Sequence, residues 1–320
     1  MDERATMTVT WPDEVDAVFG GDLTAALAYV TPAGGTVLTP VAPIGLRDRA
    51  AGTVGFTTSL GFGRKLERIA ANPLVALAYH CRDHGLSAQP GFALVQGRAE
   101  AQPTSEALIE ELGKRSVAYL GTPRRGPFWD RWLSAYYVDR ILVTVTVERI
   151  LWWPSSDASG APVVFGRPWP DAPASQAAPA KGTAARLDAA KLAKRLSAPH
   201  RLVGWTGADG CPVVVPVGAI TAHPDRIDLA TGGGLLPEGG RRAAVLAHDY
   251  RAHLVGLRER HSLGWMTADG HDGHATFHPH SSGGFVAPPN KTLLLLANGF
   301  LARRGLKRAR AAQRKSGTTT

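Results

Sequence analysis

Apolar positions along the chain form short strand-like runs in each half, with a polar, proline-rich stretch between the two sets. In the first half, residues 36–44, 53–59, 74–79 and 92–101 are rich in β-branched and apolar side chains and end at turn residues, as strands do. Residues 64–73 interrupt this series, because their apolar side chains recur at helical spacing before an Asn-Pro stop. The pattern therefore predicts strand, strand, a short basic helix, strand and strand.

The chemistry of the first half is concentrated where the second strand meets this helix. The strand ends in three hydroxyl side chains, a loop containing Gly61 follows, and the helix begins with a glycine and two cations. These residues are Thr57, Thr58, Ser59, Gly63, Arg64 and Lys65. Glycine lets the backbone approach a ligand closely, a helix N-terminus attracts anions, and Arg and Lys add charge-assisted hydrogen bonds. The pattern predicts a phosphate site, with a solvent-exposed helix start as the open alternative.

The order of these elements resembles the flavin-binding split β-barrel of the pyridoxamine 5′-phosphate oxidase-like superfamily, which includes deazaflavin-dependent reductases. That family shows a Thr-Pro strand, a strand ending in hydroxyls, a Lys that opens a helix, an Asn-Pro or Asp-Pro stop, and a later Gly-x-Ala/Glu strand. The matching residues here are Thr39-Pro40, Thr57-Thr58-Ser59, Lys65, Asn72-Pro73 and Gly97-Arg98-Ala99-Glu100. Two features depart from the family pattern: Arg68 stands where an Asn is usual, and Gly63-Arg64 is an uncommon lead into the Lys.

The resemblance implies a cofactor, FMN or the deazaflavin coenzyme F-420, and an oxidoreductase that transfers two electrons or a hydride to a small-molecule substrate. It also implies that residues Pro40–Pro43 run beside the flavin ring, with Thr39, Pro40 and Val41 among the cofactor-binding residues, while the hydroxyls, Arg64 and Lys65 hold the phosphate. Arg64 and Arg68 would suit the more acidic tail of the deazaflavin. A flavoprotein of this fold that binds the cofactor without turnover is the non-enzymatic alternative.

The second half repeats the order of elements of the first, so we expect a mainly β chain with flanking helices, built as two tandem split β-barrels with a degenerate second copy. The expected domains are residues 1–154, 185–301 and a basic tail at 302–320, with an Ala/Pro-rich linker at 155–184. Residues 232–248 are interpreted as a copy of the glycine loop and basic helix. In the resembled family the cofactor lies between two barrels of a homodimer. Here the second barrel can replace the partner, as an intramolecular pseudo-dimer.

In that second copy the best match to Lys65 is Arg241 or Arg242. Of the three hydroxyls at the end of the strand in the first half, the second copy keeps one, Thr231. The copy is therefore expected to keep the fold and to lose the phosphate.

A histidine-rich segment near the end of the second half gives a competing hypothesis. It contains His271, His274, His278 and His280, which could gather a transition metal or ligate haem. Some split barrels degrade haem rather than bind flavin, so a haem-binding protein is the alternative function. The spacing matches no defined zinc pattern, and we therefore expect no metal site there.

Charge and cysteine content limit which ligands and which cellular location we expect for the protein. Of the net charge of +9, seven positive charges come from Arg and Lys residues after position 302, so the basic balance belongs to the tail. No aromatic side chains interleave these cations, so nucleic-acid binding is not expected. Cys81 and Cys211 form no pattern and are expected to be structural. With a charged N-terminus and apolar runs too short to span a bilayer, we expect a cytoplasmic protein.

Hydrolase chemistry is not expected, because the chain contains no Gly-x-Ser-x-Gly nucleophile motif. Tyr136 and Tyr137, together with the histidines of 271–280, are candidate proton donors for a flavin reaction.

Overall fold

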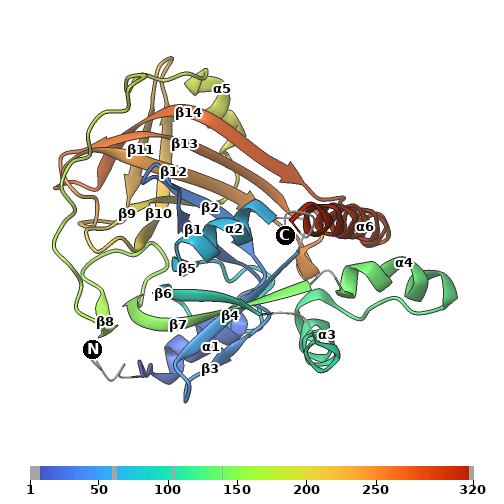
Figure 1. Cartoon of the computed structure of the whole chain (residues 1–320). Coiled ribbons are helices and arrows are strands. Elements are labelled where there is room, and N and C mark those ends of the chain that lie inside the picture. The colour runs from blue at the N-terminus through green and yellow to red at the C-terminus, as the bar shows by residue number, and fades with distance from the viewer. Residues whose placement is uncertain (1–7, 60–62, 103–104, 139, 317–320) are drawn as a thin grey trace.

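The computed structural model describes residues 8–59, 63–102, 105–138 and 140–316. Gly61, which the sequence places in the predicted phosphate loop, lies outside these residues. Figure 1 shows two β-rich halves that pack against each other, with helices at one side. The mainly β fold with flanking helices and two tandem halves is therefore confirmed.

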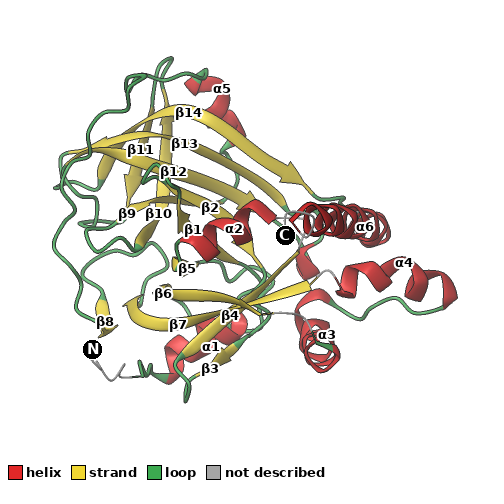
Figure 2. Cartoon of the chain, viewed as in Figure 1, coloured by secondary structure: helices red, strands yellow, loops and turns green. Residues whose placement is uncertain are grey.

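The first half is an eight-stranded sheet in the order β2-β1-β5-β6-β7-β4-β3, with β8 paired to β7. Its strands are β1 (Ala25–Val30), β2 (Thr36–Val41), β3 (Arg47–Asp48), β4 (Thr53–Ser59), β5 (Leu74–Tyr79), β6 (Phe92–Gln102), β7 (Arg140–Trp153) and β8 (Val163–Gly166). Its helices are α1 (Asp13–Gly21), α2 (Gly63–Ala71), α3 (Glu106–Leu120) and α4 (Pro127–Val138). Figure 2 shows α2 beside the strands and α3 and α4 outside them.

The sheet of the first half curls until its two ends meet. Ala42, directly after β2, forms an isolated bridge with Thr57 of β4, and the Thr57 N–H donates to the Ala42 carbonyl at 3.1 Å. The chain turns between the two strands at Gly45, whose φ of 65° falls in the left-handed region that glycine tolerates best. This closure places the end of β2 beside the hydroxyl-bearing end of β4.

The second half is a closed barrel in the order β10-β11-β14-β13-β12-β9. Its strands are β9 (His200–Thr206), β10 (Pro212–Ala222), β11 (Ile227–Thr231), β12 (Gly239–Asp249), β13 (Arg258–Ala268) and β14 (His274–Val286). The helix α5 (Ala189–Arg195) precedes it, the 3-10 turn η2 (Ala252–Leu254) lies between β12 and β13, and the long helix α6 (Lys291–Ser316) follows it.

The expectation of a glycine loop and basic helix at residues 232–248 is wrong. Residues 239–249 form β12, which pairs on one side with β9 and on the other with β13. Arg241 is buried within this strand, and its guanidinium donates to the carbonyl oxygens of Pro173 and Pro237. A continuous apolar run fits a buried strand as well as a helix by periodicity alone, and pairing with two neighbouring strands decides in favour of the strand.

The two halves share one hydrophobic interface. Along β1, Ala25 and Leu27 point into the core of the first half, while Ala26 and Ala28 join the cluster that contains the second barrel. Side chains alternate across a strand, so β1 is buried on both faces. Strands of the first sheet that also contact the second barrel are β2, β5 and β6.

Polar contacts fix the register of the halves. The Gln96 side chain of β6 donates to the Pro212 carbonyl at 2.7 Å. Arg149 of β7, 2% exposed, donates to the Gln96 side-chain oxygen at 2.8 Å and to the Asp209 carboxylate at 2.6 Å. A buried guanidinium with several partners is held in one orientation, so this triad fixes how the two halves meet.

The expected linker and tail are more ordered than their composition indicates. Within the linker range, β8 pairs with β7, and Ser175 exchanges hydrogen bonds with Gly240 of the second barrel. Residues 302–316 of the range predicted as a basic tail belong to α6, which packs beside α4 (Figure 1), and residues 317–320 lie outside the described residues. Trp132 of α4 donates to the Leu296 carbonyl at 3.2 Å. Within the described residues, no helix combines the length and the hydropathy needed to cross a bilayer.

Candidate functional site

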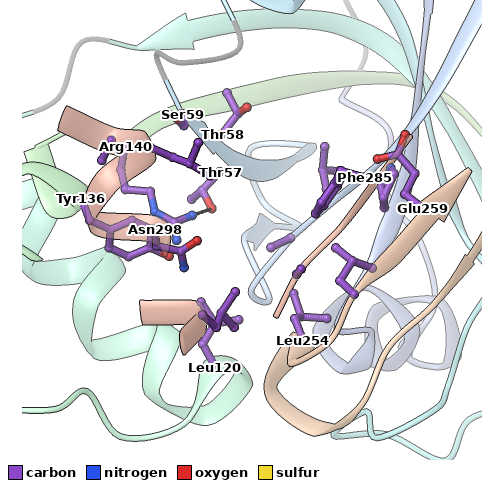
Figure 3. Close-up of a pocket in the computed structure, with 18 of the residues that line it drawn as sticks. Thr57, Thr58, Ser59, Leu120, Tyr136, Arg140, Leu254, Glu259, Phe285 and Asn298 are labelled. Atoms are coloured by element: carbon purple, nitrogen blue, oxygen red, sulfur yellow. Dashed lines mark hydrogen bonds between the residues drawn. The ribbon is translucent and has the colours of Figure 1, made fainter. Parts of the chain in front are cut away.

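A cavity of about 570 Å³ lies where the two halves and α6 meet. The first half contributes the ends of β2, β4 and β7 and the start of α2, and the second half contributes η2, β13 and the end of β14. The helix α6 forms a third wall. Figure 3 shows Thr57, Thr58, Ser59 and Arg140 on one side of this space and Glu259 and Phe285 across it.

Most of the site residues predicted from the sequence gather at this cavity, and three do not. Those that line it are Thr39, Pro40, Val41, Thr57, Thr58, Ser59 and Lys65. Gly63, Arg64 and Arg68 belong to α2 but do not line the cavity. Arg64 is exposed, and the Arg68 guanidinium lies 5.9 Å from the centre of the Tyr29 ring. A helix turns its side chains through all directions, so neighbours in sequence such as Arg64 and Lys65 face different sides.

The pairing of β4 with β7 brings a further cation to the hydroxyls. Ser59 and Arg140 are direct partners across these strands, and the Arg140 guanidinium donates to the Thr57 hydroxyl at 3.0 Å. The same guanidinium lies 4.4 Å from the centre of the Tyr136 ring, a cation–π geometry. Figure 3 shows Arg140 and Tyr136 side by side at the cavity wall. The hydroxyl cluster is thus flanked by an oriented guanidinium.

Burial changes the protonation chemistry of both cations. It lowers the pKa of Lys65 to about 8, against the opposing attraction of the Glu259 carboxylate. It also lowers the pKa of Arg140, to about 10. Desolvation disfavours the charged form of a base, and an anion placed beside it restores that form. Two such cations beside three hydroxyls make this end of the cavity suited to an anionic group.

The opposite wall carries a glutamate that pairs with a histidine. Glu259 of β13 is 4% exposed and lines the cavity, and its carboxylate oxygen lies 2.7 Å from Nδ1 of His261. A buried carboxylate needs a partner of this kind to remain charged. The cavity wall therefore combines the cations of the first half, and Lys291 and Arg304 of α6, with the Glu259 carboxylate.

Apolar side chains form the remaining surface. They come from α3, η2, the loop before β13, the end of β14 and α6. The larger ones are Leu120, Leu254, Leu257, Phe285, Leu294, Leu295 and Leu301. An apolar chamber with a few convergent polar groups is the usual form of a small-molecule site, and the volume lies within the roughly 300–1,000 Å³ that such sites occupy.

Sequence reasoning missed Arg140 and α6. The alternating run that begins at Arg140 predicted a strand, but the register that places this cation beside Ser59 is a tertiary property. The apolar residues of α6 that line the cavity include Leu294, Leu301 and Ala302, and their helical spacing was the available signal. Of the two tyrosines among the candidate proton donors, Tyr136 lines the cavity, and the side chain of Tyr137 is not among those described.

The histidine-rich segment does not assemble a site. His274, His278 and His280 belong to β14, His278 and His280 lie against the backbone carbonyls of Asp225 and Thr183, and His271 lies in the turn before the strand. In the part of the chain that the structure describes, the group of metal-ligand side chains close enough to share an ion contains none of them.

No protein-family model and no curated protein sequence matches the chain. Solved structures similar to it include a putative pyridoxamine 5′-phosphate oxidase from Listeria innocua, 15% identical, covering 45% of this chain and 98% of that one at a TM-score of 0.32. An F420 reductase is 21% identical, and the match covers 42% of this chain and 94% of the reductase at a TM-score of 0.31. A pyridoxamine 5′-phosphate oxidase-related FMN-binding protein from Nostoc punctiforme is 10% identical, and the match covers 41% of this chain and 73% of that protein at a TM-score of 0.27.

Proposed function

We propose that the cavity binds a flavin-type cofactor, FMN or the deazaflavin coenzyme, and that the protein is an oxidoreductase acting on a small molecule. The observation that carries the proposal is the pairing of two partly buried cations, Lys65 and Arg140, with the hydroxyls of 57–59 at one end of an apolar chamber. A ligand with an anionic end and a flat apolar body fits this division, and both cofactors have that form.

The donor set favours the phosphate at the β4 end. Lys65 would supply a mobile ammonium, Arg140 a guanidinium held by its bond to Thr57, and Thr58 and Ser59 neutral donors. Charge-assisted hydrogen bonds of this kind are about twice as strong as neutral ones. The end of β2, with Thr39, Pro40 and Val41, would then run along the ring, where backbone groups can reach its polar edge.

The protein groups bind and orient, and they keep water away from the ring. The leucines of α6 and η2 cover the chamber, which strengthens the electrostatic interactions inside it. When bound, the flavin supplies the two-electron or hydride chemistry, while its surroundings set the polarity at the ring. Groups at the cavity that can hold a proton include Tyr136, His253 and Glu259, whose carboxylate lies beside His261.

The two halves of one chain together line the cavity, and this supports an intramolecular pseudo-dimer over a homodimer. Residues from both halves of one chain line the cavity, and the interface between the halves is hydrophobic and buried on the β1 side. A second subunit is then not needed to complete the site.

Absorbance spectra of the purified full chain, taken alone and after adding FMN, the deazaflavin coenzyme or haem separately, test the binding. We expect a bound flavin-type spectrum that Lys65→Ala weakens and the matched control Arg64→Ala, on the exposed face of α2, leaves unchanged. A Soret band without flavin binding would overturn the proposal. Steady-state reduction assays test the enzymatic part: tight flavin binding without turnover of any acceptor would leave a non-catalytic flavin-binding protein.

A further inference from the structure

A second cluster of chemically active side chains lies between the two halves, outside the cavity. Cys81 and Asp83 follow β5 of the first half, and His200 begins β9 of the second. Sγ of Cys81 lies 3.0 Å from Nε2 of His200, and Oδ2 of Asp83 lies 3.1 Å from the same nitrogen. All three ligand atoms lie within 4.8 Å of one another. Cys81 was expected to be structural, since it forms no sequence pattern with the other cysteine.

This arrangement differs from a catalytic relay. In a relay the nucleophile and the carboxylate contact different nitrogens of the imidazole, so that the ring passes a proton from one side to the other. Here the thiol and the carboxylate both approach Nε2, which holds at most one proton. Three atoms that converge on one point are arranged as ligands of a shared ion.

We propose that Cys81, Asp83 and His200 bind a divalent transition-metal ion, with Zn²⁺ as the ion that this set of ligands suits best. Thiolate, imidazole and carboxylate are the three protein ligands of zinc, at about 2.3, 2.0–2.1 and 2.0–2.2 Å. In a tetrahedron these bond lengths place the nitrogen roughly 3.3–3.5 Å from the carboxylate oxygen and roughly 3.5–3.6 Å from the sulfur. The observed separations of 3.0 and 3.1 Å need to open by no more than about half an ångström.

The surroundings support the three ligands. The Tyr250 hydroxyl donates to Sγ of Cys81 at 2.9 Å, as a second-shell donor to a metal thiolate does. Nε2 of His80 lies 2.7 Å from Nε2 of His248, and the His200 ring is 5.3 Å from that of His248, so imidazoles pack against the inner side of the cluster.

The outer side of the cluster is open. The Asp83 side chain is 58% exposed and that of His200 is 15% exposed. Solvent therefore has access on the Asp83 side, where a water molecule can take the fourth position of the ion.

A metal held here would join the halves, since its ligands come from both. A ligand that binds the folded state alone raises its stability, and unfolding separates Cys81 from His200. The site is distinct from the proposed cofactor cavity, whose lining includes none of the three residues. Its test therefore does not depend on flavin binding.

The experiment uses the full chain, stripped with a chelator and titrated with Zn²⁺ by calorimetry and with Co²⁺ by absorbance. The variants are Cys81→Ser, His200→Gln and Asp83→Asn, and Cys211→Ser is the matched control, since that cysteine is equally buried and lies outside the cluster. We expect one equivalent of metal per chain, a thiolate-to-cobalt charge-transfer band, and a raised unfolding temperature with Zn²⁺. Cys81→Ser and His200→Gln should lower the affinity at least tenfold and Cys81→Ser should abolish the band, while Cys211→Ser keeps both.

Absence of stoichiometric binding to the unaltered chain, or a cobalt spectrum without the thiolate band, would overturn the proposal. So would affinity that is unchanged in Asp83→Asn, a variant at an exposed position whose folding, checked by circular dichroism, is least at risk.

Discussion

Lys65 and Glu259 line the same cavity from opposite halves of the chain, and the Glu259 carboxylate partly offsets the burial that lowers the pKa of Lys65 to about 8. The two residues lie far apart in sequence, and the packing of the halves alone brings them together. The relationship makes the cavity a property of the whole chain rather than of the first barrel.

The pKa of Lys65 predicts how cofactor affinity depends on pH. A bound phosphate raises this pKa above its value of about 8 in the free protein, so binding above pH 8 requires proton uptake and the affinity falls as pH increases. Loss of one charge-assisted hydrogen bond, about 1.5–3 kcal/mol, corresponds to roughly a tenfold to hundredfold weaker affinity. Fluorescence titrations with FMN at a series of pH values below and above 8 measure this change in affinity. Lys65→Arg, which keeps its charge, should flatten the profile, and an equally steep profile in that variant would contradict the assignment.

The role of α6 as a wall predicts that its inner face controls binding. Ala302 is 2% exposed and lines the cavity, so Ala302→Phe places a ring in the space proposed for the cofactor. We expect flavin affinity to fall at least tenfold. Phe300→Ala is the control on the same helix, because Phe300 is 56% exposed and does not line the cavity. Similar affinities in both variants would remove α6 from the site.

The contacts of Arg149 predict that this residue contributes much of the stability of the interface between the two halves. Arg149→Met leaves the Asp209 carboxylate, only 14% exposed, without its buried cation, and removal of one partner from such a pair costs about 3–5 kcal/mol. Arg167→Ala breaks a pair in which the Arg side chain is 53% exposed, where we expect about 0–1 kcal/mol. Urea unfolding midpoints compare the two variants. Equal midpoints would show that the Arg149 network contributes little.

The shared cavity predicts the stoichiometry of the protein. If both halves of one chain complete the site, the protein is a monomer in light scattering and binds one flavin per chain at saturation. A dimer that binds its flavin between two first halves would contradict the pseudo-dimer.

Local patterns predicted the elements of the first half well, because turn residues and alternation mark the ends of short strands. They also placed Lys65 and the hydroxyls together, since strand end and helix start are adjacent in the chain. They could not place Arg140 beside Ser59, because the register of β4 with β7 is set by packing. They assigned Arg64 to the site, although α2 turns it outward.

The second half shows the limit of periodicity. The run from Ala243 to Ala247 is apolar on both faces, so it fitted a helix in sequence and is a strand buried between β9 and β13. The cluster of Cys81, Asp83 and His200 had no sequence signal, because its members come from different halves. The histidines of 271–280 had a strong signal, but pairing in β14 directs His278 and His280 to backbone carbonyls.

The central claim is that Lys65 and Arg140 make the β4 end of the cavity a phosphate site. The most direct measurement compares the affinities of the full chain for FMN and for riboflavin, which lacks the phosphate, and likewise for the deazaflavin coenzyme and its phosphate-free core. We predict that the phosphorylated member of at least one pair binds tenfold or more tightly, and that Lys65→Ala and Arg140→Met each reduce this preference while Arg64→Ala retains it. Equal affinities within both pairs, or a preference that survives both substitutions, would contradict the account.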